Sequence, residues 1–239
     1  MADKNYIVVS SYTKGTPYKS EADRLQETLE KHEVPYCITA LEDLGSWREN
    51  CRATNHVIMD GFARFPDKDI VWLDADARVR KYPVLFDNYM YDIGLYFPEW
   101  PPGSGKMQCR TGTMYLKNTE RVRRFFGDYT LWRDEGEANF EAEKDFGSLV
   151  KQSGLNFDPS FPGEYCMIFH NWLDNVDHSL FTEEGIEPGF KLEDVVILQN
   201  MSMKRYIRKV NRRPPRDEEL IQLIKKIVRE ILEEGKNGS

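Results

Sequence analysis

The feature that most constrains the fold is a series of short apolar runs, the first two of which are followed by stretches with helical periodicity. The runs are Tyr6–Ser11, which is rich in β-branched residues, Val34–Ile38, Asp69–Leu73 and Asp92–Phe97, and all are too short for helices. Strands that alternate with helices pair in parallel, through right-handed crossovers. The first half of the chain therefore predicts an α/β fold with strands buried between helices.

Start and stop signals bound the helices. Ser20 is predicted to cap the first helix, and Ser46 with Glu49 forms a capping box for a second helix that ends before Pro66. Thr119 is predicted to cap a third helix, whose inward face includes Trp132.

The second half is less regular. Thr113–Lys117 and Asp194–Leu198 are predicted strands, and residues 141–152 a helix. After Pro214 and Pro215, Asp217 begins an amphipathic C-terminal helix. We expect one domain over residues 1–210 and a basic linker with a packed helix over residues 211–239. The alternative for that helix is dimerisation, so the chain is expected to be a monomer or a dimer.

Composition excludes several classes of protein. No apolar run reaches the length needed to span a bilayer, and the N-terminus lacks the apolar core of a signal peptide, so we expect a cytoplasmic protein. The four cysteines form no Cys-x-x-Cys pair and are expected to be reduced, although two disulfides are possible. No His-Glu-x-x-His spacing occurs, which disfavours zinc hydrolase chemistry.

The candidate chemistry lies at the end of one predicted strand. Asp74 and Asp76 follow Asp69–Leu73 directly, and ligands of open α/β sheets bind beyond the carboxyl ends of strands. Two carboxylates there can hold Mg²⁺ or Mn²⁺, which neutralises a departing diphosphate. The bare pattern is weak, because Asp67 and Asp69 match it too; we interpret that second pair as a solvated turn.

The sequence around these aspartates resembles the Asp-x-Asp region of GT-A fold nucleotide-diphospho-sugar glycosyltransferases. Residues 63–79, followed by Pro83, carry the resemblance, and looser likenesses occur at Tyr6–Thr13, Arg110–Leu116, Glu143–Asp145 and residues 195–204. The resemblance implies a mixed, mainly parallel sheet flanked by helices. It also implies transfer of a sugar from a nucleotide-diphosphate donor, a UDP-sugar above all, to an acceptor hydroxyl.

The resemblance further implies roles for individual residues. Asp74 would face ribose and metal, Asp76 would bind the metal, and Asp145 would deprotonate the acceptor, with Glu164 as a weaker candidate base. Other donor-binding positions are Ser10, Ser11, Tyr12, Thr13, Arg52, Asn55, Lys204 and Arg205. Gly112, Thr113 and Trp100 would lie on the acceptor side. Simpler roles remain open: a solvated helix face for Arg52, and a charge at a helix N-terminus for Asp145.

One departure from the resemblance concerns the metal. Many relatives place a metal-binding histidine after the last buried strand, where this chain has Gln199 and Asn200. An amide oxygen is a poorer ligand than imidazole, so the metal is expected to rely on the two aspartates, diphosphate and water. Lys204, Arg205 and Arg208 would help to hold the diphosphate.

The acceptor is suggested by charge. The net charge is −7, yet seven basic and no acidic residues occur from Lys204 to Arg216. Such a run suits a DNA backbone. Small soluble enzymes resembling this one glycosylate hydroxymethylated pyrimidines, such as 5-hydroxymethylcytosine, in bacteriophage DNA. We therefore expect a double-stranded DNA acceptor, reached by base flipping, with contacts from Arg208, Lys209, Arg212, Arg213 and Arg216. Arg78, Arg80 and Lys81 would extend this surface.

Other functions stay open. A bacterial glycan or protein acceptor is nearly as consistent with the sequence, and the basic run could be a solvated surface paired with glutamates elsewhere. A non-catalytic nucleotide-sugar or DNA-binding protein is a further alternative. A nucleotidyltransferase is disfavoured, because the loop after the first strand has one glycine, Gly15, rather than a glycine-rich phosphate loop.

Overall fold

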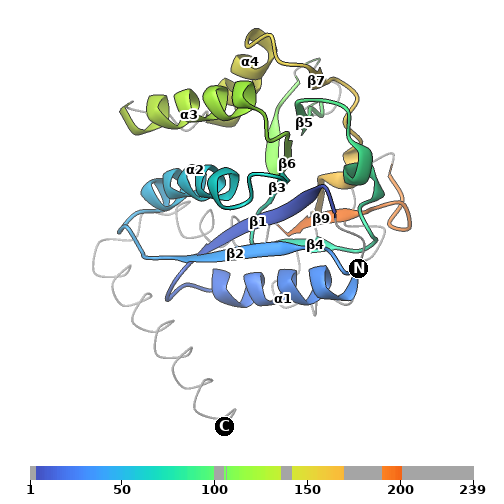
Figure 1. Cartoon of the computed structure of the whole chain (residues 1–239). Helices are drawn as coiled ribbons and strands as arrows, with labels where there is room; N and C mark the ends of the chain where they lie inside the picture. The colour runs from blue at the N-terminus through green and yellow to red at the C-terminus, as the bar shows by residue number, and fades with distance from the viewer. Residues whose placement is uncertain (1–3, 100–104, 106, 136–141, 170–189, 201–239) are drawn as a thin grey trace. The chain divides into compact units, whose positions relative to one another are not determined.

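A six-stranded sheet organises the described part of the chain (Figure 1). The computed structural model describes residues 4–99, 105, 107–135, 142–169 and 190–200, all within one compact unit, Met1–Asn200. The strand order is β2-β1-β3-β6-β5-β7. The strands are β1 (Tyr6–Thr13), β2 (Tyr36–Leu41), β3 (Asp69–Leu73), β5 (Ile93–Tyr96), β6 (Arg110–Leu116) and β7 (Phe157–Asp158).

The pairing is mixed. β1 is parallel to β2 and β3, and β5 is parallel to β7, whereas β6 is antiparallel to both β3 and β5. The parallel pairing that the alternation in the first half predicts is confirmed for β1, β2 and β3, whereas β5 pairs antiparallel with β6. The mixed, mainly parallel sheet that the resemblance implies is confirmed.

A smaller three-stranded sheet follows the aspartates. It has the order β4-β9-β8 and consists of β4 (Ala77–Val79), β8 (Met167–Phe169) and β9 (Ile197–Asn200). The strand predicted at Asp194–Leu198 begins three residues later, because Asp194 and Val195 form a turn. β4, β7 and β8 were not predicted, since two or three residues are too few to show a period.

Helices cover both faces of the large sheet. α1 (Tyr18–Lys31) lies on one face, and α2 (Trp47–Arg64) lies on the other, with α3 (Glu120–Glu135) and α4 (Ala142–Gln152) beyond it (Figure 1). Each face has its own core. Residues on alternate positions of β1 and β3 pack either with α1 or with α2 and α3. Short 3₁₀ helices occur at Val84–Asn88 and Gly163–Tyr165.

The helix start signals are partly confirmed. Ser46 caps α2 and accepts a hydrogen bond from the Glu49 N–H at 3.2 Å, and α2 ends at Arg64, before Pro66. The cap predicted at Ser20 is wrong: α1 begins two residues earlier, and the Ser20 hydroxyl donates to the Pro17 carbonyl at 2.8 Å. The inward position predicted for Trp132 is also wrong, because its side chain is 45% exposed.

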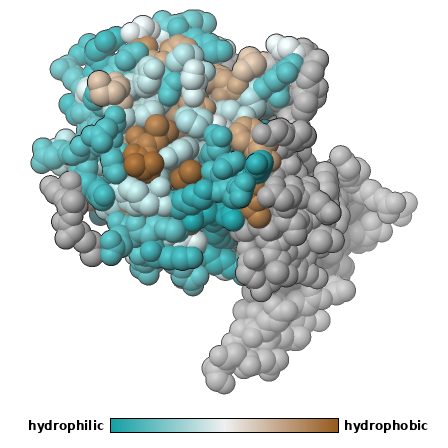
Figure 2. Space-filling view, turned by 90° about the vertical axis from the view of Figure 1, so that its right-hand side faces the viewer, coloured by the Kyte–Doolittle hydropathy of each residue, from teal (hydrophilic) through white to brown (hydrophobic). Residues whose placement is uncertain are grey.

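The surface in Figure 2 is mostly hydrophilic, with apolar side chains in small patches. No helix in the described part of the chain is both long and apolar enough to cross a membrane. The four cysteines all lie within the described residues and form no disulfide, which confirms the prediction of reduced thiols. The C-terminal helix and the basic run from Lys204 to Arg216 lie outside the described residues.

Candidate functional site

The chain reverses its direction of winding where the predicted acidic pair lies. From β1 the connection through α1 leads to β2 on one side, and the connection through α2 then leads to β3 on the other side. Ligands of open α/β sheets bind outside the carboxyl ends of strands at such a reversal. Asp74 and Asp76 leave β3 there, next to the end of β1.

Asp74 is held from two directions. Its backbone N–H donates to the Gly112 carbonyl at 2.9 Å, and the Trp72 indole N–H donates to Asp74 Oδ1 at 3.0 Å. The Asp74 carbonyl also accepts from the Ala77 N–H at 2.9 Å, which forms a tight turn into β4. Asp76 in this turn is 8% exposed, while Asp74 is half-buried. The acidic turn, residues 74–77, therefore presents two carboxylates on a backbone with little freedom to move.

Tyr18 faces the same carboxylates from the first turn of α1. Burial raises the pKa of its phenol most, and the negative charges of Asp76 and Asp74 raise it further. Cys51 of α2 contributes to the same shift. Tyr18 thus lies near Asp74 and Asp76, which follow β3, and near Cys51 of α2. Tyr18 was not predicted as a site residue, because a helix starting after Ser20 places it in a loop.

Gln199 joins the acidic turn to β6. Its side-chain Nε2 donates to the Gly112 carbonyl at 2.9 Å and to Thr113 Oγ1 at 2.8 Å. The side chain is 4% exposed, and its Oε1 has no hydrogen-bond partner among the described residues. The structure thus brings the predicted residues Gly112 and Thr113 beside Asp74, with Gln199 packed against them.

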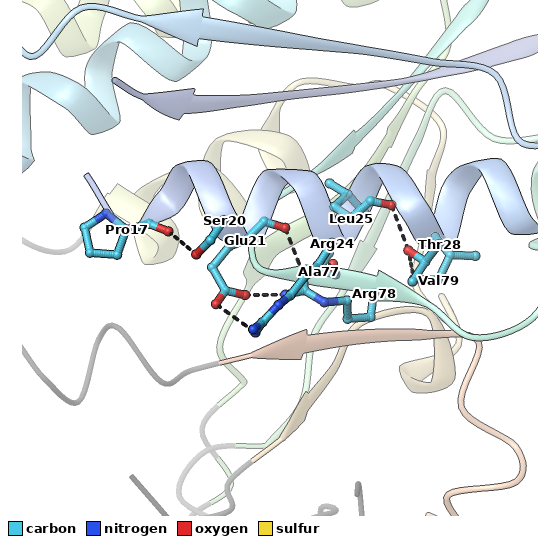
Figure 3. A network of polar contacts seen from close by, with 9 residues as sticks. All are labelled: Pro17, Ser20, Glu21, Arg24, Leu25, Thr28, Ala77, Arg78 and Val79. Atoms are coloured by element: carbon cyan, nitrogen blue, oxygen red, sulfur yellow. Dashed lines mark hydrogen bonds and ion pairs between the residues drawn. The ribbon is translucent and has the colours of Figure 1, made fainter. Parts of the chain in front are cut away.

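A buried ion pair fixes the strand that follows Asp76 (Figure 3). Arg78 pairs with Glu21 of α1, and its Nη1 donates to the Glu21 carbonyl at 3.2 Å and the Ala77 carbonyl at 2.6 Å. Two turns further along α1, Thr28 Oγ1 accepts from the Val79 N–H at 3.1 Å. Arg78 is only 4% exposed.

Of Arg78, Arg80 and Lys81, which are expected to extend a nucleic-acid surface, the structure contradicts only Arg78; Arg80 is half-buried and Lys81 is exposed. Arg78 is buried, Arg80 Nη1 donates to the Leu192 carbonyl at 2.7 Å, and Lys81 Nζ donates to the Glu193 carbonyl. The three side chains therefore bind neighbouring segments of their own chain.

The predicted donor residues of β1 line the same edge of the sheet. β1 runs parallel to β3, with Val9 opposite Trp72, so Ser10–Thr13 extend toward the level of the acidic turn. Ser10 is fully buried and its hydroxyl has no hydrogen-bond partner among the described residues. Ser11 and Tyr12 are half-buried, and Thr13 is 9% exposed.

Arg52 and Asn55 lie on α2, but they face different partners. Arg52 pairs with Glu49 at 2.9 Å, and Asn55 is buried against α3, where its Oδ1 accepts from Arg133 Nη1 at 3.4 Å. Arg133 also lies over the Tyr129 ring, 5.8 Å from its centroid. Sequence analysis gave no signal for Arg133, since only tertiary packing brings α3 to α2.

Of the two candidate bases, the structure describes the side chain of Glu164 and only the backbone of Asp145. The backbone of Asp145 lies in the first turn of α4, and its side chain is outside what the structure describes. Glu164 is half-buried in the 3₁₀ helix Gly163–Tyr165, and its carbonyl accepts from the Val196 N–H at 2.9 Å. Trp100, Lys204, Arg205 and the side chain of Asn200 lie outside the described residues.

The chemistry of the acidic turn fits a hard divalent cation. Asp74 and Asp76 offer carboxylate oxygens, the donors that Mg²⁺ and Mn²⁺ prefer. Within the described residues, no group of three or more His, Cys, Asp or Glu side chains could hold a metal. An ion here would complete its coordination with substrate phosphates and water, as Mg²⁺ does in many phosphate sites.

The second Asp-x-Asp match lies at the opposite end of β3. Asp67 is exposed in a turn, whereas Asp69 accepts hydrogen bonds from the Tyr115 hydroxyl and, at 2.7 Å, from the Asn118 N–H. The solvated turn is confirmed for Asp67. It is wrong for Asp69, whose carboxylate binds β6 and the residues after it.

Three solved structures that are similar to this chain are glycosyltransferases. One is involved in the glycosylation of the major capsid of PBCV-1: identity is 17%, the match covers 64% of this chain and 80% of that one, and the TM-score is 0.51. Two structures of the glycosyltransferase GlyE from Streptococcus pneumoniae TIGR4 are 14% and 16% identical, over 69% and 82% of this chain, each with a TM-score of 0.46. The chain spans about half of GlyE, 48% and 54% of the two chains.

Sequence comparison adds no family assignment: no protein-family model and no curated protein sequence matches the chain. At 17% identity, the similarity to the PBCV-1 enzyme concerns the fold alone. This chain therefore shares its α/β fold, a mixed and mainly parallel sheet between helices, with a glycosyltransferase.

Proposed function

We propose that the chain is a metal-dependent glycosyltransferase that moves a sugar from a nucleotide-diphosphate donor, a UDP-sugar first, to an acceptor hydroxyl. One observation carries the proposal. Asp74 and Asp76 leave β3 at the reversal point of a glycosyltransferase-like sheet, where Gly112 and Trp72 bind Asp74 and Gln199 binds Gly112. A sheet of this kind without such a pair would support no particular chemistry.

The donor would lie between β1 and the acidic turn. Ser10–Thr13 would contact the nucleoside, and Asp74 and Asp76 would hold Mn²⁺ or Mg²⁺ beside the diphosphate. When bound there, the ion supplies Lewis-acid neutralisation of the diphosphate charge. Tyr18, with its proton held by a raised pKa, would donate a hydrogen bond to a phosphate oxygen.

The acceptor hydroxyl needs a base. In the proposed reaction its oxygen bonds to the anomeric carbon, the bond from that carbon to the diphosphate breaks, and the hydroxyl proton passes to Asp145. Positioned bases contribute about 10²- to 10⁴-fold to rate. Asp145→Asn should therefore lower kcat by about 100-fold or more, with an unchanged KM for the donor. Glu164→Gln is the control, and a larger loss there would move the role of base to Glu164.

Donor binding is tested by thermal shift with UDP, GDP, CDP, ADP and dTDP, each with and without Mn²⁺. A ligand at about 100 times its Kd stabilises the folded state by about 2.7 kcal/mol. We expect a Mn²⁺-dependent shift with one nucleotide, UDP first, that Asp76→Asn abolishes. Asp67→Asn is the matched control, because this exposed aspartate belongs to the second Asp-x-Asp pair.

The outcomes separate enzyme from binding protein. A nucleotide shift without sugar release to any acceptor would support the alternative of a non-catalytic nucleotide-sugar binder. No shift with any nucleotide would contradict the proposal. DNA affinity that falls with salt and is indifferent to Asp76→Asn would instead favour a DNA-binding protein without catalysis.

For the acceptor, we propose hydroxymethylated pyrimidine in double-stranded DNA, on the charge of the segment Lys204–Arg216. The burial of Arg78 removes part of the support for this acceptor. A glycan or protein acceptor is the alternative, and glycosylation of a capsid protein by the similar PBCV-1 enzyme favours testing it.

Transfer to hydroxymethylated DNA, but not to unmodified DNA, is the expected result. Charge reversal at Arg212 and Arg213 should weaken that transfer and spare donor hydrolysis. Equal activity on DNA at every salt concentration would contradict the DNA acceptor, because phosphate contacts are salt-dependent.

A further inference from the structure

The strand that follows the acidic turn has little support of its own. β4 contains three residues and pairs within its sheet with β9 alone, in the register Ala77 to Gln199. Three residues in one pairing do not form a rigid element by themselves. Ala77 and Val79 pack in the core on the α1 face of the large sheet, and side chains of α1 bind Arg78 and the Val79 backbone.

Residues of α1 bind β4 at two levels that are two helical turns apart (Figure 3). Glu21, in the first turn of α1, pairs with Arg78 through its carboxylate and accepts from Arg78 through its carbonyl. Thr28, two turns further along α1, accepts from the Val79 N–H. Arg78 thus uses its planar fork to bind both the side chain and the backbone of one residue.

Stability alone does not require this pair. The Arg78 and Glu21 side chains are 5% and 9% exposed, so both charges are removed from water at a cost that their mutual attraction has to offset. Buried ion pairs can often be replaced by apolar side chains without loss of stability. The residues around the pair indicate a role for it other than stability.

Those surroundings are the acidic turn. Asp76 lies two residues before Arg78, and its negative charge acts on the guanidinium. Tyr18 lies one turn before Glu21 on α1 and faces Asp74 and Asp76. The first turn of α1 therefore contacts the acidic turn through Tyr18 and the strand behind it through Glu21.

We propose that Glu21 and Arg78 are positioning residues for Asp74 and Asp76. They fix the path of residues 76–79 against α1, so that the two carboxylates keep the arrangement that binds a divalent cation together with a nucleoside diphosphate. This inference rests on the proposed function. Neither residue touches the substrate; both act through the backbone that carries Asp76.

The test replaces the pair without changing net charge, by Glu21→Met combined with Arg78→Met. Affinity for Mn²⁺ in the presence of UDP is measured by electron paramagnetic resonance, and unfolding by a thermal melt without ligand. We expect an unchanged or raised Tm, together with an affinity weakened by about 10- to 100-fold, the range found for residues that orient metal ligands. KM for the donor should rise more than kcat falls.

The matched control is an exposed ion pair on the same helix, Lys19 with Asp23 at 2.7 Å, removed by Lys19→Gln with Asp23→Asn. It should leave Mn²⁺ affinity unchanged. If the paired methionine variant does not fold, Arg78→Lys serves instead, because it keeps the charge and loses the fork; a several-fold weaker affinity is expected.

Different results overturn the proposed function and the positioning role of Glu21 and Arg78. Wild-type protein that binds no Mn²⁺ with UDP or with any of the other four nucleoside diphosphates overturns the proposed function and this inference with it. Wild-type and paired variant binding Mn²⁺ equally well overturns the inference alone. An equal loss in the Lys19–Asp23 control also overturns it, because the effect would then not depend on the buried pair.

Discussion

At the scale of single residues, the candidate site depends on a shared backbone acceptor. The Gly112 carbonyl accepts both the Asp74 N–H and the amide of Gln199. The Gln199 side chain packs where Gly112 lacks a side chain. A Cβ added to Gly112 would lie 3.0 Å from Gln199 Cδ and 3.2 Å from its Oε1. A glycine is needed here for close approach, and not for an unusual backbone conformation.

Gly112→Ala should therefore displace the Gln199 amide and weaken its bonds to Gly112 and Thr113. Burying unsatisfied polar groups costs about 1–3 kcal/mol, which a denaturant titration would detect. The control is Gly127→Ala in α3, where the new Cβ would meet only Met59 Cε at 3.6 Å. That change should be neutral or stabilise by up to about 1 kcal/mol. Equal effects in the two variants would contradict the role of Gln199.

At the scale of elements, the ends of α1 and α2 decide what reaches the acidic turn. α2 begins at a true cap, Ser46, and carries Cys51 one turn later, whereas α1 begins after Pro17 with no side-chain cap. The earlier start of α1 is what turns Tyr18 toward Asp74 and Asp76. The first backbone N–H groups of a helix have no partner within the helix, so the N-terminal ends of α1 and α2 favour anionic groups.

Ser46→Ala and Ser20→Ala test the two helix starts against each other. Loss of a serine cap costs about 1 kcal/mol of stability, so Ser46→Ala should lower the midpoint of denaturant unfolding. Ser20→Ala should change it little, because the Ser20 hydroxyl donates within α1 and caps nothing. The reverse order of effects would support the helix start predicted from the sequence.

At the scale of the whole molecule, burial divides the four cysteines into two pairs. Cys109 and Cys166 are 2% and 1% exposed, and Cys37 and Cys51 are half-buried. Burial raises the pKa of the Cys166 thiol from 9.0 to about 11, against the opposing charge of Arg110. The folded thiol therefore keeps its proton where the unfolded one has lost it. Stability from this group is complete below pH 9 and falls as the pH rises toward 11.

Thiol labelling follows from this division. At neutral pH the folded protein should react at Cys37 and Cys51, and at all four positions only after unfolding. In a Cys37→Ser background, Mn²⁺ with UDP should slow labelling of Cys51, since Cys51 lies near Tyr18 and the acidic turn. Mn²⁺ with adenosine is the control. Rapid labelling of Cys166 in folded protein would contradict the burial of its thiol.

Most of the large sheet could be predicted from local pattern. β3 has the predicted bounds, and the other strands of the first half lie within a few residues of theirs, because each contains a short apolar run. The antiparallel direction of β6 could not be predicted, since a buried strand has the same pattern in either direction. β4 and β8 were missed because they depend on pairing with β9 and not on their own composition.

The sequence alone determined the α/β class, the strand that ends in Asp74 and Asp76 and the capping of α2, because these depend on neighbours within one turn or one strand. Tertiary structure decided which distant residues reach the acidic turn: Tyr18 and Glu21 from α1, Gly112 from β6 and Gln199 from β9. It also decided that Arg78 is buried rather than exposed to an acceptor. The physical reason is that a charge in a sequence carries no mark of its solvent exposure, which is set by the elements that pack around it.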